Sequence, residues 1–212
     1  RTLHALLSEF PVSGAIALRC GADLKRFFSS RAMHTAVQSG KSIVLAFGDW
    51  MSREQRIREP SCKCANQIEL AMAQLRRPSG RPTGASEINL APHAAVLRLA
   101  AGSLALYQQA QEQLSRAHKE LASAALNPQT ALKLSGLNSG TENILIERKA
   151  DGQMTMEALP EGLAALLTLV NTGCALTDLI QCANDLGAEG DEAQEIIDGL
   201  YSDGLLVNTL TS

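Results

Sequence analysis

The feature that most constrains the fold is an Asp-Gly pair set between two strand-like segments. Residues 143–149 (NILIERK) and 153–159 (QMTMEAL) flank Asp151 and Gly152. Asp-Gly favours a tight turn between antiparallel strands, because glycine accepts the positive φ that such turns need. The sequence therefore predicts a β-hairpin across this region.

Three short helices and a final strand are expected after the hairpin. Leucine, isoleucine and alanine recur at helical spacing in three consecutive segments, and an apolar run follows Gly204. This order predicts a small winged-helix-like domain in which the last strand joins the hairpin as a three-stranded sheet. The helices are expected at 161–171, 176–186 and 191–202, and the strand at 205–210.

The first two-thirds of the chain is expected to be mainly helical. Aromatic residues are only 3 % of the composition, so its core is expected to consist of Leu, Ala, Ile and Val. The segment 42–47 (SIVLAF) fits either a strand or a buried helical turn. Helices are expected at 3–10, from Asp23 to about 39, at 66–77 and at 103–126, with a loop at 78–86 and an extended segment at 88–101.

A change in composition marks the expected domain boundary. Residues 127–141 contain Pro128, Gly136 and Gly140 and few large apolar side chains. We therefore expect an α+β protein with a mainly helical domain at 1–135 and a winged-helix-like domain at 140–212. The sequence starts at Arg1 without a methionine, which suggests that residues precede it.

Charge and cysteine usage narrow the classes of function. The net charge is −3, with a pI of about 5.8, which argues against a general nucleic-acid binder. No apolar run approaches the roughly 20 residues that span a bilayer. Five scattered cysteines are typical of reduced thiols, so a cytoplasmic location is expected.

The residue types that carry catalysis do not form a recognisable motif. Cys62 and Cys64 provide two thiolates, whereas a structural zinc needs four ligands, and the four histidines are scattered. We expect no catalytic residue, metal or cofactor in this chain. Arginines 53, 56 and 58 form a basic cluster, which is either a solvated surface or a protein interface; Arg53, Arg56 and Arg58 are our candidates for a partner interface.

Five segments together resemble a known family. They are similar to a family of partner proteins that accompany the iron-dependent MbnB-type peptide oxygenases of ribosomal peptide biosynthesis. This family carries the description "putative DNA-binding". The resemblance covers about two-thirds of the chain and depends on element order and hydrophobic pattern. The segments are 39–51 (SGKSIVLAFGDWM), 66–77 (NQIELAMAQLRR), 88–99 (INLAPHAAVLRL), 142–180 and 204–210 (GLLVNTL).

The resemblance implies an accessory subunit. In this family the oxygenase subunit holds the iron and converts cysteines of a precursor peptide to oxazolone and thioamide groups, as in methanobactin. The present chain would form a heterodimer with the oxygenase and bind the leader of the precursor peptide. Its C-terminal domain resembles winged-helix modules that take an extended peptide onto a strand edge.

The expected peptide site is an edge of the hairpin. Ile144, Leu145 and Ile146 are our first candidates for the paired strand, with Ile197 and Leu200 as the groove floor. The segments 154–156 and 206–208 are the other edges considered.

Two other functions are possible. A winged-helix DNA-binding regulator would use 191–202 as its recognition helix, but that segment has acidic residues and no Lys or Arg. A free-standing enzyme with Cys62 or Cys64 as nucleophile would need a nearby base.

Overall fold

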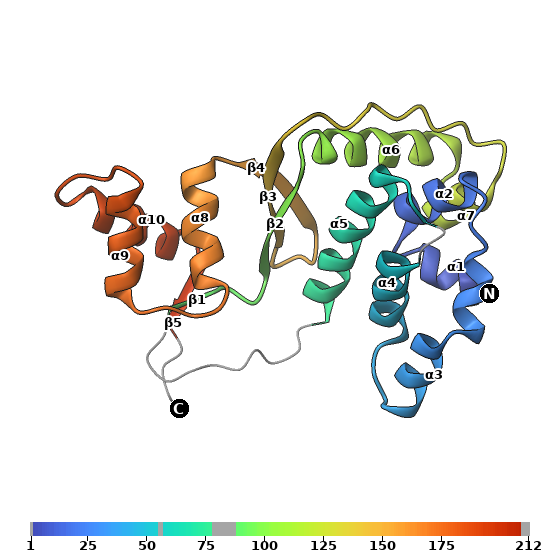
Figure 1. Ribbon diagram of the computed structural model, residues 1–212, viewed down its shortest axis with the longest axis horizontal. Coiled ribbons are helices and arrows are strands. Elements are labelled where there is room, and N and C mark those ends of the chain that lie inside the picture. The colour runs from blue at the N-terminus through green and yellow to red at the C-terminus, as the bar shows by residue number, and fades with distance from the viewer. Residues whose placement is uncertain (1, 55–56, 78–87, 209–212) are drawn as a thin grey trace. The chain divides into compact units, whose positions relative to one another are not determined.

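The computed structural model describes residues 2–54, 57–77 and 88–208 (Figure 1). It is a mixed α+β structure with two compact units, formed by residues 1–74 with 99–142 and by residues 75–98 with 143–212. The units are interleaved in sequence, whereas the expected domains, 1–135 and 140–212, are consecutive. The expected loop at 78–86 lies outside the described residues.

The first unit is helical, as the sequence predicts. The segment 42–47, for which the sequence allowed a strand or a helical turn, is helical. Ser42 is its N-cap, and the Ser42 hydroxyl accepts the Leu45 N–H. Asp23 and Ser30 cap the two preceding helices in the same way. The elements are α1 (Thr2–Leu7), α2 (Pro11–Arg19), the 3-10 helix η1 (Leu24–Ser29), α3 (Arg31–Gln38), α4 (Ile43–Arg53), α5 (Pro60–Arg76), α6 (Ser103–Ala117) and α7 (Leu121–Leu126).

The long helix expected at 103–126 is wrong, because the chain breaks between α6 and α7. His118 adopts an extended backbone, and its ring Nδ1 accepts the Glu120 N–H at 3.0 Å. A side chain that takes a backbone donor in this way competes with the helix. Gly102, with φ 90°, occupies the N-cap position of α6, and the hydroxyl of Ser103 donates to Ala100 O.

Aromatic side chains lie at the centre of the first unit despite their scarcity. Phe10, Phe27 and Phe47 are each 0 % exposed, and the ring of Phe47 lies 5.5 Å from Phe10 and 5.1 Å from Phe27 in edge-to-face contacts. A Cβ on Gly48 would lie 2.7 Å from the Phe10 ring, so this position of α4 requires glycine for close packing. The expectation of a purely aliphatic core was therefore incomplete.

A buried carboxylate fixes the start of α2. Phe10, at the N-cap of α2, has no side-chain acceptor to offer the first turn. Glu69 of α5 supplies it: its carboxylate accepts the Val12 N–H at 2.7 Å, the Ser13 N–H at 3.1 Å and the Ser13 hydroxyl. Its negative charge also suits the positive end of the helix dipole. Glu69 is 0 % exposed, so this cap is shielded from solvent.

The second unit contains the predicted hairpin and the three predicted helices. β3 and β4 pair antiparallel, with Asn143 opposite Leu159 and Arg148 opposite Met154, and Gly152 in the turn has φ 84°. The elements of this part are β1 (Ile88–Leu90), β2 (Ala94–Ala100), β3 (Thr141–Arg148), β4 (Met154–Leu159), α8 (Glu161–Val170), α9 (Leu176–Asp185), α10 (Glu192–Ser202) and β5 (Leu206–Asn208).

The partner of the last strand differs from the prediction. β5 pairs antiparallel with β1, and Leu206 lies opposite Leu90. The third strand of the hairpin sheet is instead β2, in the order β2-β3-β4 (Figure 1). The expectation that 205–210 extends the hairpin was therefore wrong. The pairing of β1 with β5 joins segments far apart in sequence, which no local pattern reports.

One apolar core holds the sheet, the helices and the β1-β5 pair of the second unit together. Leu145 of β3, Leu167 of α8, Leu179 of α9 and Ile197 of α10 are all at most 2 % exposed within it. Burial of aliphatic side chains of this size stabilises by about 1.5–3 kcal/mol each. Among the described helices of the chain, none is long and apolar enough to cross a bilayer.

Candidate functional site

The strand β4 is an edge of its sheet. β3 lies between β2 and β4, so β4 has a neighbour on one side only. An edge strand presents backbone N–H and C=O groups to whatever lies beside it, and an extended peptide can pair with them.

The hydrogen bonds at the hairpin turn determine which backbone groups of β4 point away from β3. The Lys149 N–H donates to Gln153 O at 2.8 Å, and the Gly152 N–H donates to Lys149 O at 2.9 Å. Lys149 and Gln153 therefore form a hydrogen-bonded pair. Pairs of this kind alternate along an antiparallel ladder with pairs whose groups face away.

Three residues of β4 consequently direct their N–H and C=O groups to the open side. They are Met154, Met156 and Ala158, which lie opposite Arg148, Ile146 and Ile144 in the register. Within the described part of the chain, no hydrogen bond outside the sheet involves these groups. We call Met154, Met156 and Ala158 the open edge.

The residues first expected to pair with a peptide lie elsewhere. Ile144, Leu145 and Ile146 belong to the central strand β3 and are at most 2 % exposed. Their backbone groups serve the two neighbouring strands, so they do not form an edge. The second choice at 154–156 coincides with the open edge.

The expected groove floor is also covered. Ile197 and Leu200 of α10 are 0 % and 4 % exposed and belong to the core of the second unit. Their neighbour Ile196 is half-buried and lines a surface groove instead. Helical spacing located this apolar side of α10, but it did not distinguish the core positions from the one at the groove.

The charge of the segment that contains the open edge is strongly one-sided. From residue 143 to the end of the chain, Arg148 and Lys149 are the sole basic residues, against twelve acidic ones. The Lys149 ammonium donates to Glu147 at 2.8 Å, which raises the pKa of Lys149. From residue 150 onward there are eleven acidic residues and no Lys, Arg or His. Such a segment repels phosphate and attracts cationic groups.

The arginines predicted to form a partner interface are only partly described. Arg53, at the end of α4, and Arg58, before α5, are both exposed. Arg56 lies outside the described residues. An interface role for the three stays a prediction.

The two cysteines considered as nucleophiles are buried in the first unit. Cys62 is 0 % exposed and its thiol donates to Ser13 O at 3.3 Å. Burial and then the nearby Glu69 raise the pKa of Cys62 to about 12, so the thiol is protonated at neutral pH. Cys64 is 8 % exposed. Among the described residues, no group of three or more His, Cys, Asp or Glu side chains could hold a metal ion.

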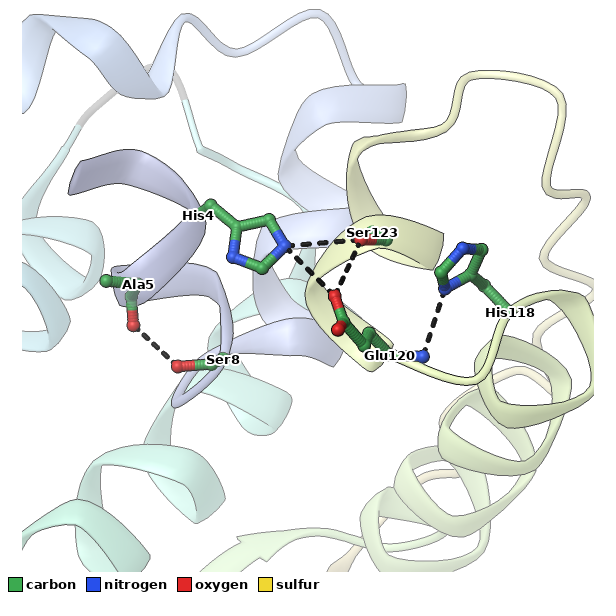
Figure 2. A network of polar contacts seen from close by, with 6 residues as sticks. All are labelled: His4, Ala5, Ser8, His118, Glu120 and Ser123. Carbon is green, nitrogen blue, oxygen red and sulfur yellow. Dashed lines mark hydrogen bonds and ion pairs between the residues drawn. The ribbon is translucent and has the colours of Figure 1, made fainter. Parts of the chain in front are cut away.

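A Ser-His-Glu cluster in the first unit resembles a catalytic triad in composition but not in geometry. His4 Nε2 lies 3.2 Å from Ser123 Oγ and 3.6 Å from Glu120 Oε2 (Figure 2). In a triad the histidine contacts the nucleophile and the carboxylate through different ring nitrogens. Here Ser123 and Glu120 both contact the same ring nitrogen, Nε2, and the Ser123 hydroxyl itself donates to Glu120. The cluster therefore connects α1 and α7 through polar contacts.

The chain matches no family model, and no curated protein matches it.

Proposed function

We propose that this chain is a non-catalytic partner protein that holds an extended precursor peptide on the open edge of β4. In this proposal it serves an iron-dependent oxygenase, the subunit that carries the metal and modifies cysteines of the peptide. The observation that carries the proposal is the set of outward, unpaired backbone groups at Met154, Met156 and Ala158. The identity of the enzyme partner comes from the family resemblance of the sequence.

The chemistry of the rest of the chain supports an accessory role. The thiol of Cys62 is kept protonated by burial, and the His4 cluster has the wrong geometry for nucleophilic catalysis. A reaction on the bound peptide would then depend on a second subunit. Five free thiols are compatible with the cytoplasm, where we place this complex.

We further propose that the second unit functions as a winged-helix-like peptide-recognition module. Its hairpin is followed directly by three helices, and the edge strand β4 is the one that leads into the first of them. In strand addition, backbone hydrogen bonds supply much of the affinity, while side-chain pockets beside the strand supply specificity. A DNA-binding role is disfavoured because α10 has no basic residue to face phosphate.

Replacing Met156 by proline tests the proposal. Proline removes the outward N–H of residue 156 and leaves the bonds between β3 and β4 intact, since those involve the neighbouring residues. The matched control is Met156→Ala, which shortens the same side chain and keeps the N–H. Binding of the fluorescein-labelled leader of the precursor peptide encoded beside the oxygenase gene is measured by anisotropy.

We expect Met156→Pro to weaken leader binding by about tenfold or more relative to Met156→Ala. The reason is that residue 156 of β4 can no longer donate its N–H to a carbonyl group of the bound peptide. Circular dichroism and retained binding to the oxygenase show that the variant is folded. Equal affinity of the two variants would rule out docking on β4.

A further inference from the structure

An apolar groove lies on the surface of the second unit, between the start of α8, the end of α9 and the start of α10. Its volume is about 350 Å³. Leu163 and Ile196 line it as half-buried side chains, and Leu186 at its rim is 48 % exposed. A groove of this size has room for a large aliphatic side chain and parts of its neighbours, but not for a whole helix.

The first residues that line the groove follow the open edge closely in the sequence. β4 ends at Leu159, Pro160 follows, and α8 begins at Glu161 (Figure 1). Gly162 and Leu163, in the first turn of α8, already line the groove. A peptide that is paired with β4 and extends past Leu159 is therefore led to the start of α8.

Acidic side chains border the groove. Glu192 is part of its lining, and Glu189 and Asp191 are exposed next to lining residues in the sequence. No Lys, Arg or His occurs from residue 150 to the end of the chain. Glu161, next to Gly162, forms an exposed ion pair with Arg98 of β2 at 3.9 Å. An uncharged or acidic peptide gains nothing from this field, whereas a basic one is attracted.

We infer that this groove is a second contact for the same peptide and that it selects a bulky aliphatic residue flanked by lysine or arginine. The aliphatic side chain fills the groove between α8 and α10, and the basic neighbours face the carboxylates at its rim. This inference rests on the proposed function, because the peptide reaches the groove from the open edge. It adds the side-chain specificity that backbone pairing alone lacks.

Two glycines allow the groove to be filled without disturbing the fold. A Cβ on Gly162 or on Gly199 would meet nothing within 4 Å, and both glycines lie in helices. Gly162 lines the groove, whereas Gly199, on α10, does not. Gly162→Trp therefore occupies the groove, and Gly199→Trp is the matched control with the same residue change on a helix of the same unit.

The probe is a phage-displayed library of random 15-residue peptides, selected on the purified full-length chain. The wild type and Gly199→Trp should enrich peptides with a strand-like segment and, beyond one end of it, a Leu, Ile or Met next to Lys or Arg. Gly162→Trp should lose the aliphatic preference and bind the peptide selected on wild type about tenfold or more weakly, as expected when one aliphatic side chain loses its burial. Salt should weaken wild-type binding.

The outcomes separate this inference from the proposed function. If Gly162→Trp and the wild type select the same consensus, or if the consensus lacks basic residues, the groove does not select the peptide and the inference is wrong. Docking on β4 still holds in that case if Met156→Pro abolishes enrichment. Enrichment that is unchanged by Met156→Pro overturns the proposed function, and the inference with it. A wild-type selection that enriches no peptide overturns both.

Discussion

Replacing Glu69 by glutamine tests the buried cap of α2. The substitution keeps the shape of the side chain and removes its charge. One of the two oxygens becomes an NH2 group, which cannot accept, so whichever way the amide turns, the backbone N–H of Val12 or of Ser13 loses its acceptor in a site that is 0 % exposed. With about 1–3 kcal/mol for a buried donor left unpaired, we expect a loss of about 1–3 kcal/mol in the free energy of unfolding.

The assay is urea unfolding followed by far-ultraviolet circular dichroism. Glu112→Gln is the control, since Glu112 is 61 % exposed and pairs with Arg116 on the surface of α6. That change should cost no more than about 0.5 kcal/mol. A stability of Glu69→Gln within the range of this control would refute the assignment of Glu69 as the cap of α2.

Four further results are expected. Gly48→Ala should destabilise by about 1–3 kcal/mol, because its Cβ would lie 2.7 Å from the Phe10 ring, whereas Gly199→Ala, which meets nothing within 4 Å, should not; urea unfolding decides. The pKa of Cys62 is about 12 in the folded chain against 9.0 for an exposed thiol, so the contribution of the thiol to stability is complete below about pH 9. It should fall by about 1.4 kcal/mol per unit as the pH rises from 9 toward 12, a slope that Cys62→Ala should lack. Elemental analysis of the purified chain should find no stoichiometric metal, and one tightly held zinc or iron per chain would contradict this. Co-expression with the oxygenase should yield a heterodimer on a sizing column at micromolar concentration, and Arg53→Glu should weaken it if the basic cluster is the interface.

The local parts of the fold could be predicted from sequence because each had its own signal. Asp151 and Gly152 marked the hairpin, and the spacing of apolar residues marked α5 and the three C-terminal helices. The break between α6 and α7 had no such signal, since it involves a hydrogen bond from the Glu120 backbone N–H to the His118 ring. A composition rich in helix formers concealed it.

The candidate site was harder to predict, because an edge strand is defined by what does not pair with it. The central position of β3 follows from its pairing with β2, which comes from more than 40 residues earlier in the chain. Alternation along 143–149 identified the two faces of β3 but carried no information on its neighbours. The same limit applies to Ile196 and Ile197, adjacent residues of which one lines the groove and one lies in the core.

The absence of basic residues after Lys149 determines which protein chemistry can report on the peptide site. Trypsin cleaves after lysine and arginine, so it leaves residues 150–212 as one fragment of 63 residues that contains β4 and all three helices beyond it. Amine-reactive cross-linkers likewise find no lysine there. A carbodiimide, which joins carboxylates to amines without a spacer, would instead link this fragment to the lysines of a bound peptide, and glutamate-specific cleavage would then locate the linked residue.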